Sequence, residues 1–151
     1  MGFIAPSMWD DETFVRLNRE QKLVWMYLIT GPESIGIPGL FKLTINGLAD
    51  GLREDADIIR ASVQKLVDLG RVHIDVNKRL FRVPNAPKYN PPQNPNHVRG
   101  WYRKWVALSD SPLKIAHVAS LRAVVDRIAD ASAKREGAGW RAAWEETFGS
   151  L

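Results

Sequence analysis

DIIRASVQKLVDLGRVHIDVNKRLFRVP, residues 57–84, is the stretch of sequence that decides the fold. Its first part places apolar residues at steps of four, three and three, which predicts a helix over residues 57–69 with one apolar face. These residues are Ile59, Val63, Leu66 and Leu69. Gly70 ends the helix, because glycine adopts the left-handed conformation of a C′ residue without strain.

A two-stranded hairpin follows this helix. Residues 71–76 alternate polar and apolar side chains, the period of a half-buried strand. Asn77-Lys78 forms a tight turn, and residues 80–83 return as a second strand that Pro84 ends.

The chain before residue 57 adds more helices and one strand. A short helix begins at acidic residues 10–12, and Asn18 caps a second helix that Gly31-Pro32 ends. Residues 33–39 form a loop, residues 40–43 a brief strand, and Thr44 caps a short helix. The predicted fold class is therefore α+β and mostly helical, with a helix-turn-helix followed at once by the hairpin.

Several segments resemble a known family. IIRASVQKLVDLGRVHID resembles the recognition helix and first wing strand of winged-helix DNA-binding domains. WDDETF, KLVWMYLITGP, GLFKL and RLFRVPNAPKYNPPQNPN resemble the N-terminal winged-helix region of phage and prophage replication proteins of the replisome-organiser or replication-initiator type. This resemblance covers roughly residues 6–108. It implies a DNA-binding protein that binds origin DNA in the cytoplasm of a bacterial host and recruits the replicative helicase or its loader.

The outer face of the 57–69 helix supplies the first candidate DNA contacts. If this helix enters the major groove, its exposed side chains reach base edges and nearby phosphates, and the wing tip lies along the backbone or in the minor groove. The candidates are Arg60, Ala61, Gln64 and Lys65 on the helix, with Ala61 available for a thymine methyl, and Asn77, Lys78 and Arg79 at the wing tip.

A second hypothesis stays open for this face. Residues 1–85 carry 11 basic and 11 acidic residues, and Asp57 and Asp68 lie at the two ends of the helix. Under this hypothesis the outer face of the helix is only a solvated surface, or the winged helix is a protein-docking module. Such a module binds and regulates a host replication or transcription complex and has little DNA affinity of its own.

Residues 86–108 read as a basic, aromatic and proline-rich linker between the winged-helix domain, residues 1–85, and the C-terminal part, residues 109–151. The linker carries the whole formal charge of +4, in Lys88, Arg99, Arg103 and Lys104. Its prolines predict a stiff, extended segment whose cations contact DNA phosphates. Its aromatic residues either stack on single-stranded bases or pack against the protein, and packing is the preferred interpretation. They are Tyr89, Trp101, Tyr102 and Trp105.

Residues 109–151 predict a helical hairpin. Ser111-Pro112 starts a helix whose apolar face runs from Ile115 to Ile128, and Gly137 and Gly139 break it near residue 135. A final helix carries Trp140, Trp144 and Phe148 at spacings of four. This aromatic stripe is either core or a partner-binding surface, and the face from Ile115 to Ile128 is the surface expected to serve a homodimer.

Composition favours a non-enzymatic, cytoplasmic protein. The chain lacks cysteine, an N-terminal signal sequence and any 18-residue apolar stretch, so we expect no disulfide, thiolate metal site or membrane span. Its three histidines lie far apart in sequence, and no phosphate-binding G-x-x-x-x-G-K-[ST] motif occurs. We therefore expect no metal and no cofactor.

Overall fold

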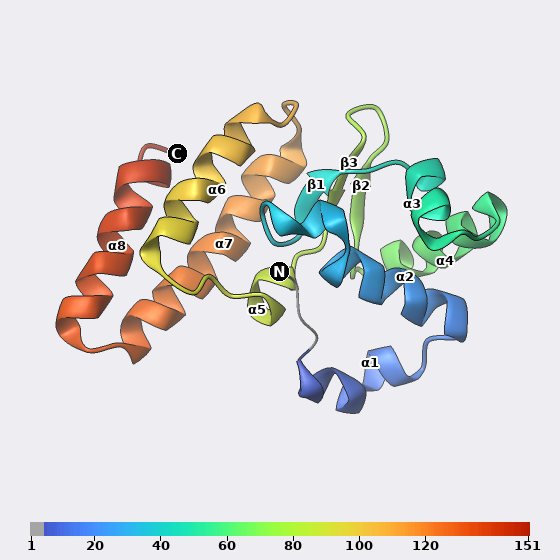
Figure 1. Cartoon of the computed structure of the whole chain (residues 1–151), viewed down its shortest axis with the longest axis horizontal. Helices are drawn as coiled ribbons and strands as arrows, with labels where there is room; N and C mark the ends of the chain where they lie inside the picture. The colour runs from blue at the N-terminus through green and yellow to red at the C-terminus, as the bar shows by residue number, and fades with distance from the viewer. Residues whose placement is uncertain (1–4) are drawn as a thin grey trace.

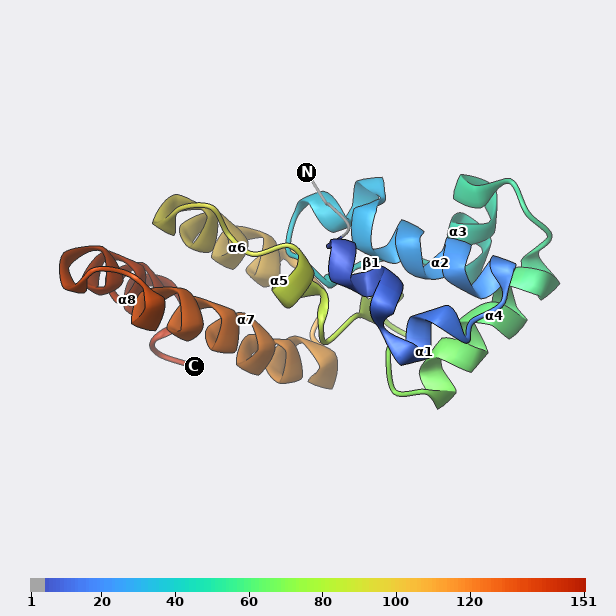
Figure 2. The ribbon, with the colours of Figure 1, turned by 90° about the horizontal axis from the view of Figure 1, so that it is seen from below.

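A three-stranded antiparallel sheet lies between two groups of helices in the computed structural model, which describes residues 5–151. The sheet contains β1 (Leu40–Lys42), β2 (His73–Asp75) and β3 (Leu80–Arg82), in the order β1-β3-β2. Leu40 pairs with Arg82 across β1 and β3, and His73 pairs with the same residue across β2 and β3. Figure 2 shows α1–α4 on one side of β1 and α6–α8 on the other.

The N-terminal helices precede and follow β1. They are the 3₁₀ helices η1 (Pro6–Asp10) and η2 (Pro32–Ile35) and the α-helices α1 (Glu12–Val15), α2 (Arg19–Thr30), α3 (Ile45–Leu52) and α4 (Ala56–Asp68). The element order from α2 to β3 is therefore helix, strand, helix, helix, strand, strand, with η2 inside the segment predicted to be a loop (Figure 1). The predicted mostly helical α+β class is confirmed.

Helix caps set these boundaries. Asn18 accepts a hydrogen bond from the backbone of Gln21, whose side chain in turn accepts from the backbone N–H of Asn18, forming a capping box. The Thr44 hydroxyl accepts from Gly47 N at 2.9 Å, as predicted. Helix α4 begins one residue earlier than predicted because Asp55 caps it, and Gly70 has the expected left-handed φ of 72°.

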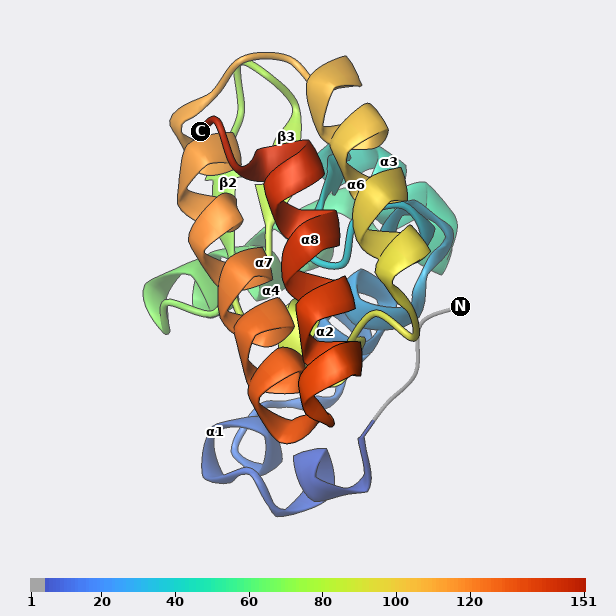
Figure 3. The ribbon, with the colours of Figure 1, turned by 90° about the vertical axis from the view of Figure 1, so that its left-hand side faces the viewer.

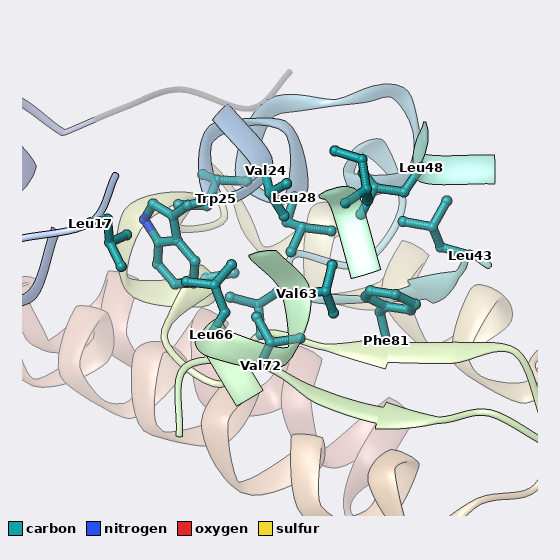
Figure 4. Packing of buried hydrophobic residues seen from close by; sticks show 14 of the residues in the cluster. Leu17, Val24, Trp25, Leu28, Leu43, Leu48, Val63, Leu66, Val72 and Phe81 are labelled. Carbon is teal, nitrogen blue, oxygen red and sulfur yellow. The ribbon is translucent and has the colours of Figure 1, made fainter. Parts of the chain in front are cut away.

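The first core cluster fills the space between α2, α4 and the sheet. Figure 4 shows Val24, Trp25 and Leu28 of α2 facing Val63 and Leu66 of α4. Three of the four apolar residues predicted for the inner face of this helix, Ile59, Val63 and Leu66, are thus buried. The fourth, Leu69, is 41% exposed, and the opposite face of α4 is open to solvent.

The C-terminal helices cover the other face of the sheet. They are α5 (Ala86–Tyr89), α6 (Pro95–Ala107), α7 (Pro112–Ala131) and α8 (Lys134–Phe148), and Figure 3 shows α6–α8 together in front of the sheet. Leu80 and Phe81 point to opposite faces of β3, yet both are fully buried, in the second and first clusters respectively. Helices α6–α8 therefore replace solvent on the second face of β3.

Two predictions about the C-terminal half are wrong. Residues 86–108 are mostly helical and not extended, because Asn94 caps α6 and Pro95 occupies its first turn, where proline is compatible with a helix. Gly137 and Gly139 lie inside α8, and the break comes earlier, at Ser132-Ala133. A Cβ on Gly137 would lie 2.6 Å from the carbonyl oxygen of Ala129, so glycine permits close contact between α7 and α8.

None of the helices in residues 5–151 is long and apolar enough to cross a membrane.

Candidate nucleic-acid interface

The outer face of α4 presents the four side chains predicted to contact DNA. Arg60, Ala61, Gln64 and Lys65 are all exposed, because Ile59, Ser62, Val63 and Leu66 take the buried positions between them. The structure brings these four predicted residues onto one accessible surface.

Local acids hold two of these side chains in the free protein. Arg60 Nη1 lies 2.8 Å from Asp57 Oδ1, and Gln64 Nε2 donates to Asp68 Oδ1 at 2.8 Å. Exposed pairs of this kind contribute about 0–1 kcal/mol, so a stronger acceptor can displace the acid at small cost. Lys65 makes no ion pair among residues 5–151, and it is the available cation on this face.

The tip of the β2–β3 hairpin is exposed, as predicted for Asn77, Lys78 and Arg79. Arg79 has a φ of 53°, which places a non-glycine residue in the left-handed region of the turn. Strand β2 covers His73–Asp75 and not the whole predicted range 71–76, and Val76, which is 80% exposed, belongs to the turn.

Asp75 organises the hairpin tip, and its role was not anticipated from sequence. Its Oδ1 accepts from the backbone N–H of Lys78 at 3.1 Å, and its Oδ2 accepts from the Ser111 hydroxyl at 2.7 Å. The hydrogen bond from Ser111, followed by bonds within the turn, holds the pKa of Asp75 below its ordinary value. Since Ser111 also caps α7, the β2–β3 hairpin is tied to the C-terminal helices.

The cations of residues 86–108 do not form one basic stripe. Arg99 pairs with Glu146 of α8 at 2.8 Å, and this hydrogen bond raises the pKa of Arg99 and lowers that of Glu146. Lys104 lies on another side of α6, beside Gly36, and Lys88 lies on α5. Arg103 is exposed. The expectation that these cations lie along one extended segment is wrong: Arg99 and Arg103 share a face of α6, but Arg99 is paired with Glu146, and Lys104 and Lys88 lie elsewhere.

The aromatic residues of the same segment pack within the protein. Trp101 and Trp105 are buried in the second cluster, and Trp105 Nε1 donates to the carbonyl oxygen of Lys114 at 3.2 Å. Tyr102 stacks on Trp105, and Tyr89 contacts Trp25 edge-on. The preferred interpretation, that these side chains pack and do not stack on bases, is confirmed for the two tryptophans.

The partner-binding prediction for Trp140, Trp144 and Phe148 is wrong in the folded chain. Their exposed fractions are 8%, 5% and 1%, because α8 lays this stripe against α6 and α7. Most of the apolar face proposed for a homodimer is likewise used internally, since Leu121 and Val125 are fully buried, whereas Ile115 at its N-terminal end is 62% exposed. The alternative that the aromatic stripe is core therefore holds.

A partly buried polar network joins the sheet to α7 through Arg82 of β3. Arg82 donates from Nε to His117 Nδ1 at 3.2 Å and from Nη2 to the Ser120 hydroxyl at 3.0 Å, while its Nη1 lies 3.1 Å from His73 Nδ1. His117 Nε2 lies 2.7 Å from the carbonyl oxygen of Pro38. Burial, opposed by the hydrogen bond to Pro38 and assisted by the charge of Arg82, lowers the pKa of His117 to about 4.

Sequence reasoning missed this network because its members lie far apart in the chain. One local signal was present: Arg82 is a charged residue between the apolar strand residues Phe81 and Val83, and a charged side chain in such a strand requires polar partners.

Within residues 5–151, no three His, Asp or Glu side chains come together in a group that could hold a metal ion.

No protein-family model matches the chain, and no curated protein or solved structure matches it either.

Proposed function

We propose that the chain is a winged-helix DNA-binding protein in which α4 is the recognition helix and the β2–β3 hairpin is the wing. The observation that carries the proposal is the outward face of α4, where Arg60, Ala61, Gln64 and Lys65 share one accessible surface. The element order and the strand order β1-β3-β2 support the winged-helix assignment.

The side chains of α4 have distinct roles in this proposal. Gln64 reads a base edge in the major groove, because its amide can both donate and accept, and Lys65 contacts a phosphate. Arg60 leaves Asp57 when a phosphate or guanine becomes available, since the exposed ion pair is weak. Lys78 and Arg79 at the wing tip contact flanking phosphates.

Origin DNA of a phage or prophage is the first candidate target, by the resemblance of residues 6–108 to replication proteins. In that role the chain would recruit a replicative helicase or its loader. The recruiting surface is then not the aromatic stripe of α8, because that stripe is buried.

A protein-docking role is the second candidate. Ile58, which directly follows Asp57 in the first turns of α4, is 47% exposed, and such an apolar side chain beside an acid suits a protein partner better than a phosphate backbone. Ile58 thus favours the alternative in which α4 binds a host complex.

Fluorescence anisotropy with a mixed-sequence DNA duplex separates the two functions. At low salt the wild-type chain should bind, and Lys65→Gln should lower the slope of log affinity against log salt by about 0.9, the value for one lost phosphate contact. Arg127→Gln is the matched control, because Arg127 is an exposed cation of α7 on the other side of the sheet.

The absence of binding at low salt would reject the DNA-binding function and leave the docking module. An equal change in slope for Lys65→Gln and Arg127→Gln would show attraction by overall charge and reject α4 as the interface.

A further inference from the structure

A groove lies between the two helix groups, away from the exposed face of α4. It runs between the segment around η2, residues 34–38, and the first two turns of α6, and its volume is about 450 Å³. Figure 1 shows α6 beside the loop that precedes β1. A volume of this size is in the range of pockets that hold small ligands.

The groove combines an apolar base with polar groups on α6. Pro38, Pro92 and Trp101 contribute the apolar part and are buried. Asn96, His97 and Lys104 contribute polar side chains, and no acidic side chain lines the groove. His97 Nδ1 accepts from the backbone N–H of Gln93 at 3.2 Å, so its Nε2 carries the proton of the neutral ring and remains a donor.

Lys104 is the positive charge of this groove. Its side chain crosses toward the opposite wall, where its Cδ lies 3.2 Å from the Cβ position of Gly36. It makes no ion pair with any residue that the structure describes, whereas Arg99, five residues earlier on α6, is paired with Glu146. A lysine placed among amide and imidazole donors with no carboxylate beside it favours an anion.

We propose that this groove binds a phosphate-bearing ligand of mononucleotide size. A phosphate group has enough acceptor oxygens to take bonds from Lys104, His97 and Asn96. A planar ring covers the apolar wall of the groove, where Ile35 is 62% exposed beside Pro38. The phosphate belongs either to a free nucleotide or to the terminal nucleotide of a DNA strand. The proposal does not rest on DNA binding by α4, because the groove and α4 belong to different parts of the fold.

Gly100 offers a variant that fills the groove and keeps the fold. It lies in the interior of α6 and lines the groove, and a Cβ at this position meets no atom within 4 Å. Leucine is a better helix former than glycine, so Gly100→Leu should fold while its side chain occupies the ligand volume.

Titrations followed by ¹H–¹⁵N NMR test the proposal with thymidine 5′-monophosphate, thymidine and inorganic phosphate as probes. We expect the monophosphate to shift the amide signals of Gly36 and Gly100 and the indole signal of Trp101. Lys104→Gln should weaken binding about tenfold, as for the loss of one charge-assisted hydrogen bond, and Gly100→Leu should abolish it. Arg103→Gln, which removes the neighbouring exposed cation outside the groove, should bind as the wild type does.

Single-stranded octathymidylate with and without a 5′-phosphate distinguishes the two sources. Tighter binding of the 5′-phosphorylated strand than of the monophosphate identifies a strand end, and equal or weaker binding identifies a free nucleotide. The proposal is overturned if the monophosphate shifts none of these signals at millimolar concentration, if inorganic phosphate binds equally well, or if Arg103→Gln weakens binding as much as Lys104→Gln.

Discussion

Acidification should destabilise the protein through His117, which is buried between the two helix groups. The neutral ring accepts from Arg82 Nε at Nδ1 and donates from Nε2 to the carbonyl oxygen of Pro38. A second proton on Nδ1 would face the guanidinium of Arg82. The pKa of His117 is accordingly lowered from 6.5 to about 4 in the folded protein.

The sign and size of the effect follow from this difference. The unfolded chain binds a proton at His117 from about pH 6.5 downward, whereas the folded chain resists it until about pH 4, so stability falls as the pH falls between these values. The full difference of about 2.5 pKa units corresponds to about 3 kcal/mol, of which about 2 kcal/mol is lost by pH 5. His73 adds to the loss in the same direction, because burial and then the charge of Arg82 lower its pKa as well.

Urea unfolding followed by tryptophan fluorescence at pH 7.5, 6.5 and 5 measures this loss. The variant His117→Gln keeps an acceptor and a donor but does not titrate, so its stability should be lower at pH 7.5 and should fall less steeply with pH. The control His97→Gln removes an exposed histidine and should retain the wild-type pH dependence. An identical pH dependence in wild type and His117→Gln would refute the reasoning.

Three further predictions concern the packing of the two halves. Gly100→Ala should raise the free energy of unfolding by about 0.5–1 kcal/mol, because alanine has the higher helix propensity and its Cβ meets no atom there. Gly137→Ala should lower the free energy of unfolding, because its Cβ would meet the Ala129 carbonyl oxygen. Urea midpoints of the two variants that move in the same direction would contradict this pair of expectations. Leu80→Ala should cost about 2–5 kcal/mol in urea unfolding, and a cost below about 1 kcal/mol would show that the second cluster does not pack on the sheet. Asp75→Asn should speed hydrogen exchange at the Lys78 amide, while the control Asp126→Asn on α7 should leave the exchange rate unchanged. Equal protection of this amide in the wild type and Asp75→Asn would show that Asp75 does not organise the hairpin tip.

Local signals in the sequence predicted much of the N-terminal half. The caps at Asn18 and Thr44, the apolar spacing of α4 and the left-handed Gly70 are all determined by neighbouring residues, so reading them required no tertiary information. The exposed candidates on α4 followed directly, because the buried face of a helix fixes which side chains point outward.

The C-terminal half was less predictable because tertiary contacts decide it. The prolines of residues 84–95 indicated an extended linker, but the cap at Asn94 begins a helix that buries Trp101 and Trp105 against α7 and α8. Gly137 looked like a helix breaker, and only the close approach of Ala129 explains a glycine inside α8. The contacts of Arg82 with His117 connect residues 35 positions apart, a pairing that no local pattern reveals.

The most direct test of the central claim is an NMR map of the surface that changes when a DNA duplex is added at low salt. The account predicts that the backbone amide shifts concentrate on the exposed residues of α4 and on residues 76–79 of the wing, and that higher salt reverses them. Shifts confined to α6–α8, with α4 and the wing unchanged at saturating duplex, would contradict it.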